Sequence, residues 1–156
     1  MVVTQTVAAP PDLVWRVFTD VARRPSWLPD VDAVTVLAQD ADSTHWRESR
    51  FVRSARERTA VVGELRLTVL EPGRRCVVSL ASQERTAGRE YAFGRIDIGP
   101  QRGGTVITVS DASPALAGRL LDLVAGGFAT RTVEGAVREE LEALASACVT
   151  RVMVAA

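Results

Sequence analysis

Residues 133–150 read VEGAVREELEALASACVT. The apolar residues in this segment recur every three or four positions, at Val133, Val137, Leu141, Leu144 and Cys148. That spacing places them on one face of an α-helix, with Arg138, Glu139 and Glu142 elsewhere on its surface. We therefore predict an amphipathic C-terminal helix from Phe128 to Val149, whose apolar stripe must be covered by a sheet.

A second helical run precedes this segment. After Pro114, its apolar residues repeat every four positions, at Leu116, Leu120, Val124 and Phe128. The phase does not continue into the C-terminal stripe, because five positions separate Phe128 from Val133. Gly126 and Gly127 lie just before this step, where glycine costs about 1 kcal/mol relative to alanine in a helix. We expect a bend there, and Phe128 is the helical residue most suited to touch a ligand.

The rest of the chain reads as one strand, two short helices and six further strands. A β-branched strand at Val2–Val7 ends before two prolines, and apolar spacing then predicts a helix from Pro11 and a short one over Val21–Ser26. Alternating or β-branched runs predict strands at 34–37, 44–53, 58–70, 75–81, 88–98 and 105–111. Strands joined by short turns pair antiparallel, so we predict an α+β fold with a seven-stranded sheet against the long helix.

The composition excludes several kinds of chemistry. Nineteen arginines balance nineteen Asp plus Glu, so no net charge recruits nucleic acid or an anionic membrane. The chain has no lysine, which excludes Schiff-base and general-base lysines. Cys76 and Cys148 form no CxxC motif, and His45, the single histidine, has no partner at motif spacing. We expect neither a metal nor a cofactor.

The length of 156 residues suits one domain over residues 1–156. The N-terminus lacks a basic segment followed by an apolar one, and Arg119 and Asp122 interrupt the apolar stretch from Leu116 to Ala129. We therefore expect no signal peptide and no membrane span. Two thiols without a pairing pattern fit a reducing compartment, so a cytoplasmic protein is expected, as a monomer or a homodimer.

Two segments resemble a known superfamily. Residues 9–20, APPDLVWRVFTD, followed by PSWLP at 25–29, look like the opening of the START-like (SRPBCC) polyketide cyclase/dehydrase superfamily, and GGTVIT at 103–108 resembles its last strand. The similarity covers the whole chain in element order. It implies a helix-grip fold, in which a strongly curved antiparallel sheet wraps around the C-terminal helix and leaves a cavity between them.

Each strand offers two candidate sets for the cavity wall, because side chains alternate between the faces of a sheet. On the strand from Thr44 we expect Trp46, Glu48 and Arg50 to face inward, since an apolar wall with a few oriented polar groups is typical of small-molecule pockets. A surface strand with alternating charges would give the same pattern. The opposite register would turn inward His45, Arg47, Ser49 and Phe51.

On the strand from Gly88 the two sets also compete. We expect Tyr91, Phe93, Arg95 and Asp97 to face inward, with Ile96 and Ile98 as the rival core set. Trp27, at the end of the short helix, either closes the mouth of the cavity or lies half-exposed. The predicted ligand-binding set is Trp27, Trp46, Glu48, Arg50, Leu65, Leu67, Tyr91, Phe93, Arg95, Ile107, Val109 and Phe128.

Three functions fit this reading. The first is binding of a lipophilic small molecule, such as a polyketide or lipid, as a carrier or sensor, with Gly126 and Gly127 as a lid hinge. The second is a polyketide aromatase/cyclase-type enzyme, in which Glu48, Arg50 and Tyr91 are the weak candidates for proton transfer. The third is a protein-interaction regulator of the same fold, which would show a large exposed apolar patch.

Overall fold

The computed structural model describes residues 2–53, 58–80, 91–110 and 133–155, and residues 52, 53, 58–61, 80, 91–93 and 133 through their backbone only. In chain order, the elements are β1 (Val2–Val7), α1 (Pro11–Thr19), the short 3-10 helix η1 (Val21–Ser26), β2 (Val31–Gln39), β3 (Ser43–Arg53), β4 (Arg58–Glu71), β5 (Arg75–Leu80), β6 (Tyr91–Gln101), β7 (Gly104–Ser110) and α3 (Val133–Ala155). This order of elements is the predicted one.

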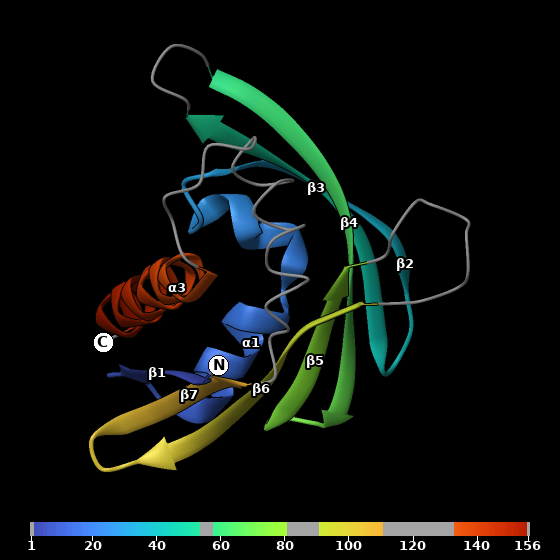
Figure 1. Cartoon of the computed structure of the whole chain (residues 1–156). Coiled ribbons are helices and arrows are strands. Elements are labelled where there is room, and N and C mark those ends of the chain that lie inside the picture. Colours follow the sequence, from blue (N-terminus) through green and yellow to red (C-terminus); the bar gives the residue numbers. More distant parts are fainter. Residues whose placement is uncertain (1, 54–57, 81–90, 111–132, 156) are drawn as a thin grey trace.

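All seven strands form one antiparallel sheet in the order β1-β7-β6-β5-β4-β3-β2. From β2 to β7, strands that follow one another along the chain are neighbours in the sheet, and β1 closes the far side against β7. The sheet is strongly curved, and α1, η1 and α3 lie on its concave side (Figure 1). The predicted α+β architecture, a curved antiparallel sheet with the C-terminal helix on its inner face, is confirmed.

The C-terminal helix α3 packs against β1 and α1. Four members of its predicted apolar stripe are buried, each at most 4% exposed: Val137, Leu141, Leu144 and Cys148. Of Val133, the first member, only the backbone is described. The helix continues past the predicted end at Val149 to Ala155. Gly126, Gly127 and Phe128, the predicted hinge and its neighbour, lie outside the described residues. No helix in the described part of the chain is long and apolar enough to span a membrane.

The inner face of the sheet and the first helix share one core. From α1, the buried side chains are Val14, Val17 and Phe18. From the strands, the buried apolar side chains are Val3, Val7, Val31, Trp46, Leu65, Leu67, Cys76, Val78, Ile96, Ile98, Ile107 and Val109. Alternation along each strand produces this inner layer, because every second residue faces the same side of a sheet. Trp15 packs partly buried against the core.

The predicted inward placement of Arg95 and Asp97 on β6 is wrong. The buried residues of this strand are Gly94, Ile96 and Ile98. The side chain of Arg95 is 41% exposed, and its Nε lies 3.4 Å from a carboxylate oxygen of Asp97. The rival set of isoleucines therefore belongs to the core, and Arg95 and Asp97 lie on the opposite, convex face.

A β-bulge in β6 is the physical reason for this error. Val78 pairs with Gly94, but the next residue of β5, Ser79, pairs with Ala92, so residue 93 is extra on β6. An extra residue shifts the alternation, and positions of equal parity on its two sides face opposite ways. One alternation over the whole strand therefore does not hold. For Tyr91 and Phe93, only the backbone is described, and their place in a cavity wall stays a prediction.

The hairpin between β6 and β7 is tighter than predicted. We expected a turn over Gly99–Gly104, but β6 continues to Gln101, and only Arg102 and Gly103 separate the two strands. Gly103 has a φ of 83°, a left-handed conformation that glycine adopts without steric cost. The short turn keeps the whole of β7 paired with residues 95–101 of β6.

Candidate functional site

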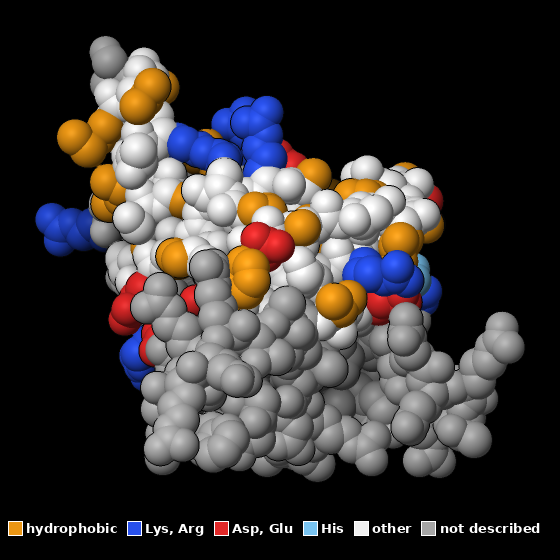
Figure 2. Space-filling view, turned by 90° about the horizontal axis from the view of Figure 1, so that it is seen from above, with side chains coloured by type: hydrophobic (Ala, Val, Ile, Leu, Met, Phe, Trp, Pro, Cys, Tyr) orange, Lys and Arg blue, Asp and Glu red, His pale blue; other side chains and the backbone are white. Residues whose placement is uncertain are grey.

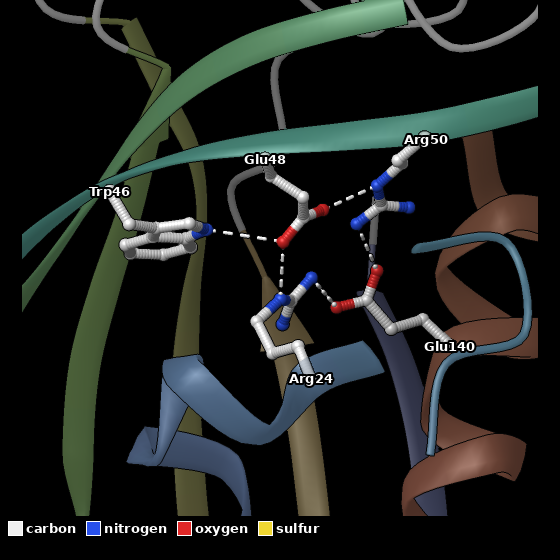
Figure 3. Close-up of polar contacts among 5 residues, drawn as sticks. All are labelled: Arg24, Trp46, Glu48, Arg50 and Glu140. Carbon is white, nitrogen blue, oxygen red and sulfur yellow. Dashed lines mark hydrogen bonds and ion pairs between the residues drawn. The ribbon is translucent and has the colours of Figure 1, made fainter. Parts of the chain in front are cut away.

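A group of charged side chains lies inside the molecule, where β3, η1 and α3 meet (Figure 3). β3 contributes Glu48 and Arg50, which are two positions apart and therefore lie on the same face of the strand. Arg24 comes from η1, and Glu140 comes from α3. We call these four residues the ion cluster. The ion cluster links these three elements.

Each guanidinium group of the ion cluster binds both carboxylates. Arg24 donates from Nε to Glu48 Oε2 at 2.7 Å and from Nη2 to Glu140 Oε1 at 2.9 Å. Arg50 donates from Nε to Glu48 Oε1 at 2.5 Å and from Nη2 to Glu140 Oε2 at 3.3 Å. All four carboxylate oxygens are therefore engaged. Two positive and two negative charges form a closed ring with no net charge.

Pairing with arginine outweighs the effect of burial on the pKa of both carboxyls. Glu48 is 2% exposed, and burial alone would raise the pKa of its carboxyl. The guanidinium groups of Arg24 and Arg50 instead hold the pKa of Glu48 below its ordinary value. The same opposition between burial and the two arginines lowers the pKa of Glu140 to about 2. Both carboxylates are therefore ionised at neutral pH.

Two indole rings flank Arg24. The guanidinium carbon lies 5.6 Å from the ring centroid of Trp27 and 5.8 Å from that of Trp46, within cation–π range. Trp46 also donates from Nε1 to Glu48 Oε2 at 3.1 Å. Trp46 is therefore hydrogen-bonded to the ion cluster (Figure 3), and both indole rings lie against its Arg24.

Nearly the whole chain matches one protein family. Residues 1–149 match a family model described as polyketide cyclase / dehydrase and lipid transport. The protein belongs to this family. The START-like resemblance seen in the opening segment and in the last strand is thereby confirmed. No curated protein matches the sequence.

Solved structures share the START-like fold at low sequence identity. A START superfamily protein from Mycobacterium smegmatis is 15% identical, with a TM-score of 0.64 over 96% of this chain and 97% of that one. A protein from Thermus thermophilus is 17% identical, with a TM-score of 0.63 over 97% of each chain. A di-domain aromatase/cyclase of the steffimycin biosynthetic pathway is 15% identical, with a TM-score of 0.62 over 97% of this chain. The match covers 51% of that di-domain chain, so this START-like chain spans about half its length.

The predicted register of β3 in this START-like fold is confirmed by burial. Trp46 and Glu48 are buried, and Arg50 joins them in the ion cluster. On the convex face, His45 Nε2 lies 3.4 Å from Glu64 Oε2, and Arg47 donates to the other oxygen of that carboxylate at 2.6 Å. His45 therefore lies on the outer face of the sheet, as expected.

Other members of the predicted ligand-binding set are also placed by the structure. Trp27, Leu65, Leu67, Ile107 and Val109 are all buried. Their position in the core is established, whereas contact with a ligand stays a prediction. Arg95 is the exception, because it lies on the convex face. Phe128 lies outside the described residues.

The role expected for Glu48 and Arg50 changes with the structure. We expected them to be oriented polar groups in a pocket wall, but they bind each other and two residues that were not predicted from the sequence, Arg24 and Glu140. A signal for Glu140 was present, because it lies three residues after Val137 and four before Leu144, on the flank of the buried stripe. Arg24 carried no comparable signal.

Proposed function

We propose that this START-like protein binds a lipophilic small molecule, such as a polyketide or a lipid, between the concave face of the sheet and α3, as a carrier or sensor. One observation carries the proposal: the inward side chains from β3 to β7 are mostly apolar, and the charged ones among them are fully paired. Such a surface accepts an apolar molecule without stranding a polar group. The family's description, which includes lipid transport, supports the same conclusion.

The protonation state of the ion cluster favours binding over acid–base catalysis. A general acid or base works best when its pKa lies near the operating pH. The pKa of Glu140 is about 2, and that of Glu48 is also lowered, because both carboxylates face two arginines. Neither group is suited to exchange protons near pH 7. A carrier or sensor is therefore our first candidate.

An aromatase/cyclase-type enzyme is the second candidate. The family's description names polyketide cyclases and dehydrases, and this observation favours it. Folding a flexible polyketide requires mainly that its reacting carbons be held close together, which a shaped apolar wall provides. In this case Tyr91 is the remaining proton-transfer candidate outside the ion cluster.

A protein-interaction role receives no support from the molecular face drawn in Figure 2. There, the described residues show hydrophobic side chains in small groups, separated by polar and charged ones. A docking surface for a protein partner would require a larger continuous apolar patch.

Native mass spectrometry of the purified protein tests the proposal directly. A retained lipophilic molecule, released on denaturation and absent from a mock purification, is the expected result. Conversion of an added poly-β-keto substrate would instead favour the enzyme. The proposal fails if the protein is isolated empty and binds neither a fatty acid nor a tricyclic aromatic probe more tightly than about 1 mM, which is only about 4 kcal/mol of binding free energy.

A further inference from the structure

The indole N–H of Trp27 is a buried donor without an acceptor. Trp27 follows η1 and is more than nine-tenths buried, with 8% of the residue exposed. Its Nε1 is inaccessible to solvent and donates to no residue that the structure describes. Indole N–H groups in protein interiors usually have a partner, because losing water without gaining one costs free energy. An acceptor is therefore expected at this position.

The neighbouring indole, that of Trp46, has a hydrogen-bond acceptor. Trp46 and Trp27 flank the guanidinium of Arg24 at 5.8 and 5.6 Å. Trp46 Nε1 donates to Glu48 Oε2, whereas Trp27 Nε1 has no such partner among the described residues. The two rings share one cation, and they differ in whether the N–H is used. The free donor thus adjoins the ion cluster.

The backbone holds the Trp27 ring in position. The main-chain N–H groups of Trp27 and Leu28 both donate to the carbonyl oxygen of Arg24, at 3.1 and 2.8 Å. The side chain of Arg24 is fixed in turn by Glu48 and Glu140. The indole is held at both its backbone and its ring face. It would therefore lose little conformational entropy when its N–H binds an acceptor.

We propose that Trp27 Nε1 donates a hydrogen bond to the polar end of the bound ligand, and that the acceptor is an uncharged oxygen such as that of a ketone or an ester. This inference rests on the proposed function, because it names the ligand chemistry of the same interior. An indole N–H can only donate, so its partner must be an acceptor. The ligand class is therefore a lipophile that carries a carbonyl group.

The ion cluster explains why the acceptor is uncharged. Arg24 and Arg50 are each bonded to both Glu48 and Glu140, so the cluster offers no uncompensated positive charge. A ligand carboxylate placed beside Trp27 would add a third buried negative charge facing two cations. Burying an uncompensated charge is strongly unfavourable, whereas a carbonyl oxygen needs only the one donor.

Three probes that share one ring system test this chemistry. Fluorenone carries a ketone, fluorene replaces it with a methylene group, and fluorene-9-carboxylate adds a charge. Trp27→Phe keeps the aromatic ring and removes the N–H. We expect the variant to bind fluorenone roughly 5- to 10-fold more weakly, the size of one neutral hydrogen bond, and to bind fluorene as well as the wild type does. The carboxylate should bind the wild type more weakly than fluorenone. Trp15→Phe, a matched change on α1, should leave all three affinities unchanged.

A second readout uses the wild-type protein. The chain contains three tryptophans, so its indole N–H groups give three ¹H–¹⁵N signals, which single Trp→Phe variants assign. Saturating fluorenone should move the Trp27 signal downfield, and fluorene should not. An unmoved Trp27 signal, or an equal loss of fluorenone and fluorene affinity in Trp27→Phe, overturns the hydrogen bond and leaves the proposed function standing. If none of the three probes binds the wild type, this inference fails, and the proposed function fails with it when the protein is also isolated empty and binds no fatty acid.

Discussion

At the scale of single residues, Glu140 connects α3 to the sheet. Its carboxylate accepts hydrogen bonds from Arg24 on η1 and Arg50 on β3. Removing one member of a buried ion network leaves its partners uncompensated, which typically costs about 3–5 kcal/mol of unfolding free energy. We therefore expect Glu140→Ala to lose about that much in a urea titration. Glu142→Ala, an exposed change on the same helix, should lose less than about 0.5 kcal/mol. Equal losses in the two variants would show that the ion cluster does not hold the helix.

The same carboxylate predicts how stability depends on pH. The pKa of Glu140 is about 2 in the folded protein, below the ordinary value of 4.5. A group whose pKa is lowered by folding stabilises the fold above its unfolded pKa and loses this contribution as the pH falls toward the folded pKa. The unfolding free energy of the wild type should therefore fall between about pH 5 and pH 2. Glu140→Gln should fall less steeply, with the residual slope including Glu48, and identical slopes would contradict the assignment.

At this scale the burial of Trp46 could be predicted from the sequence, whereas the ion pairing of Arg24 and Glu140 could not. An indole on a strand strongly favours the buried face, so Trp46 also brought Glu48 and Arg50 inward. Charged residues on helices default to solvent, and these two are exceptions because each finds oppositely charged partners far along the chain. Arg24 and Glu140 are 116 positions apart, and only the tertiary structure brings them together.

At the scale of elements, the contact between β7 and β1 depends on a glycine. A Cβ atom at Gly104 would overlap the carbonyl oxygen of Val7 in β1, whereas one at Gly99 in β6 would meet nothing within 4 Å. Overpacking against a backbone atom costs about 1–3 kcal/mol. Gly104→Ala should therefore lower the unfolding free energy by about that amount. Gly99→Ala should leave it unchanged or raise it by up to about 1 kcal/mol, because alanine reduces the entropy of the unfolded chain.

Thermal or urea unfolding of these two alanine variants gives the comparison. Both changes add one methyl group at or beside the same hairpin, so a general effect of that addition would appear in both. If Gly104→Ala matched Gly99→Ala in stability, the close approach of β7 to β1 would be wrong.

Elements differed in how well the sequence predicted them. The stripe of α3 was predicted residue by residue, because helical spacing admits only one buried face for Val137, Leu141, Leu144 and Cys148. Residues 94–98 of β6 were assigned to the wrong face, because both alternating sets of the strand contain apolar residues and a bulge at residue 93 shifts their phase. The local mark of this bulge is Gly94, an isolated glycine inside a strand pattern beside residue 93, but the register itself comes from the pairing with β5.

At the scale of the whole molecule, the order of elements already predicted the curved sheet and its helix. Six consecutive strands joined by short turns form an antiparallel sheet with neighbours in chain order, and the apolar stripe of a single long helix suits the inner face of such a sheet. The side chains that meet between the sheet and the helix were harder to predict from the sequence, because they come from three separate elements. The ion cluster is the part that no single segment revealed.

The ligand should report on this interior through Trp46. Trp46 lies on the concave face of β3 and is hydrogen-bonded to the ion cluster, so a lipophilic molecule bound there should quench or shift its emission. Binding should also stabilise the whole fold, by about 2.7 kcal/mol when the free probe is at 100 times its dissociation constant. Trp46→Leu should reduce the spectral change and leave the part that comes from Trp27, while the protein stays folded by circular dichroism.

A control variant and a stability measurement show whether the probe binds next to Trp46. Trp15→Phe, on α1, should retain the spectral change, because its indole lies outside the ion cluster. Stabilisation by the probe is measured independently of fluorescence, by urea titration with and without fluorenone. If Trp46→Leu kept the full spectral change while the probe still stabilised the protein, binding would occur away from the inner face of β3, and the interior between sheet and helix would be core alone. If Trp46→Leu reduces both the emission change and the stabilisation by fluorenone, the ligand lies against the inward face of β3.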